Sequence, residues 1–163
     1  MSLAIFCAGC GGPTSAELLS EAQKLAAKGD VTKAKSLAAS IPSQDKHWAE
    51  AQFVLAQFEL SAGDQESAVV LLNSIPLDGS QLSLEAANIL AEIQLQNCQI
   101  SEVAKQLEYV VSLQPGEFET RSRLASILVV SGQRSRADTH LMKMLTQGRI
   151  SLKDLVMLTQ PER

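Results

Sequence analysis

The sequence predicts an all-α fold, an α-solenoid of about four helix–turn–helix repeats, on three observations. Four positions, three of them glycines, recur at intervals of 34, 35 and 34 residues: Gly29, Gly63, Cys98 and Gly132, which we call the anchors. Two columns of small residues keep the same phase: Ala22, Ala56, Ala91 and Ala125 before the anchors, and Ala34, Ala68, Val103 and Ala137 after them. Aromatic residues make up only 4% of the chain, which favours closely packed helices over a β-sandwich. A period near 34 residues is typical of helix–turn–helix solenoids.

The register divides the chain into four expected helix pairs. They cover about residues 15–42, 48–76, 83–115 and 118–146, so the repeat domain spans 15–146. In each pair the anchor ends the first helix, because glycine adopts the left-handed capping conformation at little cost. The prolines Pro42 and Pro76 end the second helices of the first two pairs early. Thr14 and Ser15 mark the first helix start, although Ser15 is followed by Leu18 and not by a capping-box acid.

A short C-terminal capping helix is expected within residues 147–163. The segment from Ser151 to Thr159 carries four apolar residues, Leu152, Leu155, Val156 and Leu158. A solenoid exposes the core face of its last repeat, so a helix that covers this face is physically expected.

At these columns the sequence resembles a tetratricopeptide repeat array. The first helices carry the family's Leu-Ala pair at Leu55-Ala56, Leu90-Ala91 and Leu124-Ala125. The family's tryptophan column differs, since it holds Leu18, Gln52, Ala87 and Arg121. The resemblance implies a right-handed solenoid whose inner face is lined by the first helix of each pair. The closing stretch is also similar to the repeat segment that precedes a large domain in some bacterial surface proteins.

No residue pattern points to catalysis, a cofactor or a metal site. His47 and His140 lie far apart in the array, and no zinc-binding His-x-x-x-His spacing occurs. There is no nucleophile elbow of the Gly-x-Ser-x-Gly type and no phosphate-binding loop before a helix. We therefore expect a non-enzymatic protein.

The inner face implied by the resemblance is the expected binding site for a peptide or partner protein. On this face Phe53 and Leu60 are the expected apolar anchors. Gln57 and Asn88 are expected to hydrogen-bond the partner's backbone, with Glu92 beside them. The alternative is a structural spacer or self-association module of a larger envelope-anchored protein, in which apolar residues such as Leu152 and Leu155 pair with another copy.

The charge distribution disfavours a nucleic-acid partner. The formal net charge is −4, and residues 47–104 contain acidic residues but no lysine or arginine. The balance reverses over residues 121–153, where Asp138 is the only acidic residue. An acidic middle region repels phosphates and suits a neutral or basic partner.

Residues 1–12 are interpreted as either the remnant of a lipoprotein signal or a disordered tail. Cys10 follows Ala8 and Gly9, which resembles the lipobox in which a cysteine is lipidated. Such an anchor at Cys10 would be the chain's one link to a membrane and would place it in the cell envelope, lipid-anchored or periplasmic; otherwise we expect a cytoplasmic protein. Cys98 is expected to be a buried or half-buried free thiol.

Overall fold

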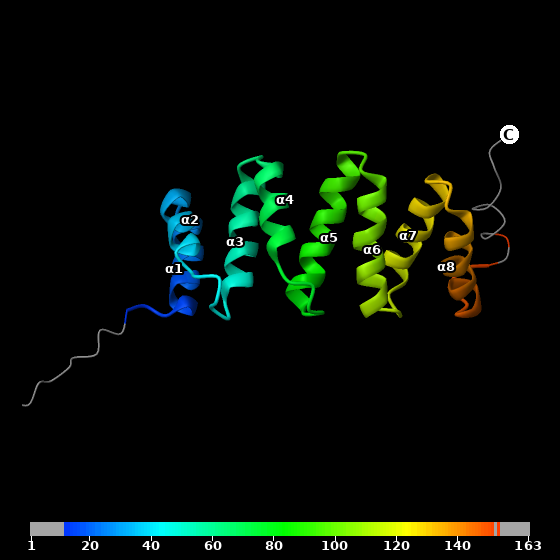
Figure 1. Cartoon of the computed structure of the whole chain (residues 1–163), viewed down its shortest axis with the longest axis horizontal. Helices are drawn as coiled ribbons and strands as arrows, with labels where there is room; N and C mark the ends of the chain where they lie inside the picture. The colour runs from blue at the N-terminus through cyan, green and yellow to red at the C-terminus, as the bar shows by residue number, and fades with distance from the viewer. Residues whose placement is uncertain (1–11, 152, 154–163) are drawn as a thin grey trace, which may run out of the picture. The chain divides into compact units, whose positions relative to one another are not determined.

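The structure is a computed structural model that describes residues 12–151 and residue 153, and this part of the chain contains helices and loops but no strand. Its eight helices are α1 (Ser15–Ala27), α2 (Val31–Ala39), α3 (Trp48–Ser61), α4 (Gln65–Ser74), α5 (Gln81–Gln96), α6 (Ile100–Leu113), α7 (Phe118–Val130) and α8 (Arg134–Thr146) (Figure 1). Successive helices pack together in five cases: α1 on α2, α2 on α3, α5 on α6, α6 on α7, and α7 on α8. The prediction of an all-α fold of helix–turn–helix units is confirmed.

The chain forms two compact units, Met1–Leu71 and Leu72–Arg163, and the division falls within α4. In the first unit, α1, α2 and α3 share a core in which Ala22, Ala34 and Ala38 form one cluster with Leu55. In the second unit, α5 to α8 share a core whose members include Ala91, Leu107, Leu124 and Leu128. The residues expected as one repeat domain thus belong to two compact bodies.

The four anchor residues all adopt the left-handed backbone conformation. The φ angles are +87° at Gly29, +82° at Gly63, +56° at Cys98 and +76° at Gly132. A Cβ atom added at any of these three glycines would meet no neighbouring atom within 4 Å. Glycine is therefore used at these turns for its backbone conformation, which reverses the chain after a first helix, and not for lack of space.

The small-residue columns lie where helices touch. Ala22, Ala56 and Ala91 are fully buried, and Ala125 is 1% exposed. The second column, Ala34, Ala68, Val103 and Ala137, is also fully buried. Small side chains at these points let the helix axes approach closely, which larger side chains would prevent.

The first helix begins with a capping box at Thr14, one residue before Ser15, for which no box was expected. Thr14 is the N-cap, its hydroxyl accepts from the backbone N–H of Glu17, and the Glu17 carboxylate accepts from the N–H of Thr14 at 2.7 Å. The Thr14 hydroxyl also donates to the Glu17 carboxylate at 3.0 Å, and the pKa of Glu17 is lowered first by the backbone hydrogen bond from Thr14 and then by this one. Ser15 has a different role, because its hydroxyl donates to Asp45 Oδ2 at 2.5 Å and so ties α1 to the loop before α3.

The start of α5 is held by a hydroxyl network, and it lies two residues before the expected start at residue 83. Ser80 caps the helix by accepting from the N–H of Ser83 at 3.2 Å. The Tyr109 hydroxyl of α6 accepts from the N–H of Gly79 at 3.1 Å and lies 2.8 Å from the hydroxyl of the fully buried Ser83. One side chain from the second helix thus fixes both the loop and the first turn of α5.

The expected capping helix and the candidate lipidation site cannot be compared with the structure. Apart from Ser151 and Lys153, the expected capping helix from Ser151 to Thr159 lies outside the described residues. Cys10 also lies outside the described part of the chain.

Candidate partner-binding face

In the first unit, α3 carries three of the expected contact residues at positions that share one side of a helix. Phe53, Gln57 and Leu60 are spaced by four and three residues. Gln57 is exposed and Leu60 is half-buried. Phe53 is only 8% exposed and belongs to the hydrophobic core. The expectation that Phe53 offers an apolar anchor to a partner is therefore corrected, since a buried ring has little surface to give.

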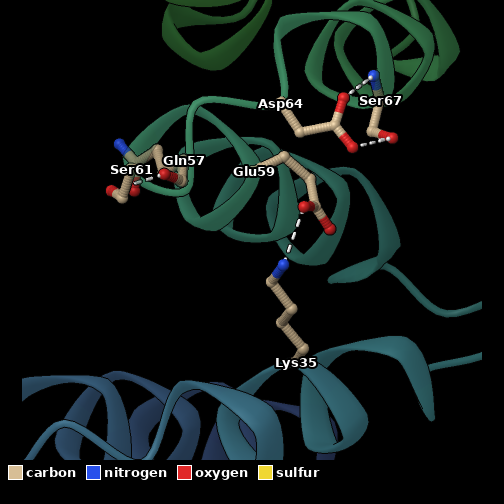
Figure 2. Close-up of polar contacts among 6 residues, drawn as sticks. All are labelled: Lys35, Gln57, Glu59, Ser61, Asp64 and Ser67. Carbon is tan, nitrogen blue, oxygen red and sulfur yellow. Dashed lines mark hydrogen bonds and ion pairs between the residues drawn. The ribbon is translucent and has the colours of Figure 1, made fainter.

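Polar contacts around the C-terminal half of α3 are shown in Figure 2. Lys35 of α2 forms an ion pair with Glu59 of α3, with 2.7 Å between Nζ and Oε2. The hydroxyl of Ser61 donates to the backbone carbonyl of Gln57 at 2.8 Å. The ion pair joins residues 24 apart in sequence, so the sequence pattern contained no signal for it.

The turn after α3 ends in a second capping arrangement. Asp64 accepts from the backbone N–H of Ser67 at 3.0 Å and from the Ser67 hydroxyl at 2.8 Å (Figure 2). The backbone hydrogen bond is the main reason that the pKa of Asp64 is lowered. This carboxylate therefore serves to begin α4, and the aspartate after the turn glycine has a structural use.

In the second unit, an ion pair links the first helices of two successive pairs. Glu92 of α5 and Arg123 of α7 approach with 2.7 Å between Oε1 and Nη2, although they are 31 residues apart. Asn88, one turn before Glu92 on α5, is half-buried, and Glu92 is exposed. The sequence pattern predicted Asn88 and Glu92 on one face but did not pair Glu92 with Arg123.

In the same unit, α7 and α8 form an apolar pocket. Its volume is about 150 Å³, and its lining residues are Ala125, Ser126, Val129, Val130 and Leu141. Val130 is 78% exposed, which is high for a large apolar side chain. The pocket lies at the end of the last described helix pair.

Arg121 is a buried cation without a carboxylate partner among the described residues. It is 3% exposed, and its Nη2 donates to the backbone carbonyl of Pro115 at 2.5 Å. Nη1 lies 3.4 Å from Nδ1 of His140, while Nε is buried with no hydrogen-bond partner in the described part of the chain. The pKa of His140 is lowered, first by burial and then by the charge of Arg121, with smaller contributions from Lys143 and Arg136.

Within residues 12–151 and residue 153, no group of three or more histidine, cysteine, aspartate or glutamate side chains is placed to hold a metal ion. In the same part of the chain, none of the helices combines the length and apolar character needed to cross a membrane. Cys98 is exposed, which corrects the expectation of a buried or half-buried thiol: its turn position directs it to solvent.

Comparison with known proteins adds no family assignment. No protein-family model matches the chain, and no curated protein is significantly similar to it.

Proposed function

We propose that this chain is a non-enzymatic interaction module, a tetratricopeptide-like array that binds a peptide or a partner protein on the side formed by its first helices. The observation that carries the proposal is the ion pair between Glu92 and Arg123. It links α5 and α7 through partly exposed side chains, so polar groups of both helices are accessible. A surface assembled from several helices offers many contact points to an extended or helical segment.

The proposed contact residues are those expected from the sequence, without Phe53, and each unit carries its own group of them. In the first unit it comprises the exposed Gln57 and the half-buried Leu60. In the second unit it comprises Asn88 and Glu92, with Leu95, 38% exposed, one turn further along α5. An amide and an apolar side chain on one helix can bind a peptide backbone and a peptide side chain together.

The partner's expected chemistry is neutral or basic. The acidic stretch over residues 47–104 is partly neutralised, because Lys35 and Arg123, which lie outside it, pair with Glu59 and Glu92. Glu85 remains exposed on α5. A peptide that brings its own lysine or arginine gains attraction from this surface, and an acidic peptide is repelled.

A peptide-display selection on the immobilised full chain tests the proposal. We expect enrichment of a defined peptide motif. The selected peptide should bind the Asn88→Ala variant with an affinity about fivefold or more lower than the wild type, the loss that a significant contact residue produces. Asn73→Ala is the matched control, because Asn73 is an exposed asparagine of α4. Failure to enrich any motif, or equal losses in the two variants, would contradict binding at this face and favour the spacer alternative.

Attachment to a membrane through Cys10 is a separate part of the proposal, supported by the small residues before that cysteine. Metabolic labelling of the full chain with a palmitate analogue in a bacterium should give labelled protein in the membrane fraction. Cys10→Ser should abolish the label, and Cys98→Ser, the control at an exposed cysteine far from this segment, should retain it. Unlabelled wild type in the soluble fraction would rule out this anchor; a single acyl chain alone holds a protein only weakly.

A further inference from the structure

The row of proposed contact residues on α5 has a counterpart on α7. Residues of the two rows are separated by 34 positions, the repeat interval: Asn88 and Ser122, Glu92 and Ser126, Leu95 and Val129. On α7, Ser126 is exposed, and Ser122 and Val129 are half-buried. The helices α5 and α7 run in the same direction (Figure 1), and the ion pair between Glu92 and Arg123 links them. The proposed partner-binding face of the second unit therefore continues from α5 onto α7.

The row on α7 ends at the apolar pocket of this unit. Ser126 and Val129 are two of its lining residues, and Leu141 of α8 is another. Val130, which also lines it, is 78% exposed, so a partner can reach the pocket from solvent. Apolar cavities of about 150 Å³ accept a ring such as benzene, so an aliphatic side chain of similar size fits.

The opposite end of both rows is acidic. Glu85 and Glu119 are exposed, and each lies three residues before the first member of its row. Glu92 is engaged by Arg123, whereas Glu85 and Glu119 form no ion pair with any described residue. Both rows thus run from an acidic start to an apolar end, and a lysine or arginine of a partner gains attraction at the acidic start.

The length of the face sets the spacing of the partner's side chains. Glu119 and Val129 are ten residues apart on α7, which corresponds to about 15 Å along a helix. An extended peptide covers this length in about four or five residues. We propose, building on the proposed function, that the partner is an extended peptide segment that inserts an aliphatic side chain into this pocket and places a lysine or arginine about four or five residues away, beside Glu85 and Glu119.

A charge placed at the pocket tests the inserted side chain. The probe is the peptide enriched by display selection on the immobilised full chain, with its affinity measured by isothermal titration calorimetry. Val130→Asp should lower this affinity about tenfold or more, the factor that corresponds to burying one leucine-sized side chain. Val70→Asp is the matched control and should leave the affinity unchanged, because Val130 and Val70 are both exposed helical valines, at 78% and 70%. Ser126→Phe fills the pocket without adding a charge and should weaken binding as Val130→Asp does.

A double-mutant cycle identifies which peptide residue enters the pocket. Replacing the aliphatic residue of the peptide by alanine should lower the affinity for the wild type about tenfold, but should change the affinity for Val130→Asp little. Peptides in which this residue and the lysine or arginine are moved closer together or further apart should bind best at about four or five residues. Best binding at about ten residues, the spacing of a helical partner, would contradict an extended one.

The acidic end is tested by removing one charge. Glu119→Gln should lower the affinity about two- to fivefold, the effect of one exposed ion pair. A peptide with glutamine in place of its lysine or arginine should bind Glu119→Gln and the wild type equally. Glu66→Gln, at an exposed glutamate of α4, is the matched control and should change the affinity little.

The outcomes separate failure of the pocket from failure of the proposed function. If Asn88→Ala weakens binding but Val130→Asp and Val70→Asp act alike, the face binds a peptide and the inserted side chain is overturned. If no peptide is enriched, both fail. A dimer mass by light scattering that Val130→Asp converts to a monomer would assign the pocket to a second copy and would also overturn the proposal. Slower hydrogen exchange of the amides of residues 126–130 on peptide binding supports insertion, and unchanged exchange contradicts it.

Discussion

At the scale of single residues, the most informative position is the buried Arg121. An arginine stays charged at all ordinary pH values, so its burial requires hydrogen bonds that replace water. Pro115 supplies a carbonyl oxygen, and the neighbouring His140 is favoured in its neutral form. The sequence showed only that an arginine occupies a repeat position at which tetratricopeptide repeats, which the chain resembles, have tryptophan.

The second unit should lose stability on mild acidification through His140. The pKa of His140 is lowered by burial and by Arg121, Lys143 and Arg136, so the unfolded chain binds the proton more tightly. The free energy of unfolding therefore falls as the pH drops below about 6.5, the ordinary histidine value, and levels off below the lowered pKa. Urea unfolding at pH 7.5 and pH 5.5 measures this fall in the free energy of unfolding, which should be smaller in the His140→Gln variant. An equal fall in both proteins would contradict this assignment.

Cys98 occupies a backbone conformation that glycine adopts more easily. Its φ angle is +56°, and its side chain is exposed, so replacing it removes little packing. Cys98→Gly should raise the free energy of unfolding by about 0.5–1 kcal/mol, since the left-handed strain exceeds the extra unfolded-state freedom of glycine. Thermal or urea unfolding measures the change. The reverse type of change, Gly132→Ala, should be destabilising by a similar amount; a gain there would contradict the argument.

At the scale of elements, helix pairs are held by small residues at their contacts and by polar groups at their ends. Ala91 is fully buried between helices of the second unit, whereas Ala39 at the end of α2 is exposed. The two positions carry the same amino acid, but one is buried and the other is exposed. Their comparison isolates the effect of close helix packing.

Ala91→Leu should be destabilising and Ala39→Leu nearly neutral. Overpacking a buried site forces side chains from their rotamers and costs about 1–3 kcal/mol. Urea denaturation of both variants, monitored by circular dichroism, measures the difference. If Ala91→Leu unfolds at the wild-type midpoint, the alanine column is not a contact column.

The Tyr109 hydroxyl should contribute measurably to the free energy of unfolding. Tyr109→Phe leaves the N–H of Gly79 and the hydroxyl of the buried Ser83 without their partner on α6. The expected cost is about 0.5–1.5 kcal/mol, the usual net contribution of a hydrogen bond, because the Ser83 hydroxyl still donates to the carbonyl of Ser80. Ser112→Ala, whose hydroxyl donates only to the nearby carbonyl of Tyr109, is the control on the same helix. Equal midpoints in urea for Tyr109→Phe and the wild type would contradict the expected role of this network.

At the scale of the whole molecule, acidic and basic residues are concentrated in different segments of the chain. The net charge is −4, and the stretch without lysine or arginine covers residues 47–104. Its ion pairs with Lys35 and Arg123 are partly exposed and each contributes little to stability, about 0–1 kcal/mol. The segregation should matter more for a partner than for folding.

Binding of a selected basic peptide should therefore weaken with salt. Raising the ionic strength from about 0.01 M to 0.15 M shortens the screening length from about 30 Å to 8 Å, which reduces long-range attraction. We expect the association rate constant to fall several-fold while the dissociation rate constant changes little, as biolayer interferometry would measure. Association that is independent of salt would show that the acidic stretch does not attract the partner.

The helix pairs of residues 15–146 and the positions of their turns were predictable from the amino-acid order alone. The anchors at Gly29, Gly63, Cys98 and Gly132 predicted left-handed turn residues, and the alanine columns predicted buried contacts; both predictions are confirmed. These features are local or periodic, because a turn needs one residue type and a helix contact repeats with the chain's own period.

Which side chains meet across helices became visible only in the folded chain. Folding buried Phe53, paired Glu92 with Arg123, joined Tyr109 to Ser83, and placed Arg121 against His140. The paired residues are separated by 19 to 31 positions, and nothing in a single sequence marks one exposed glutamate or one tyrosine for a particular distant neighbour. Pairing across helices depends on the three-dimensional arrangement of whole helices, which no local pattern specifies.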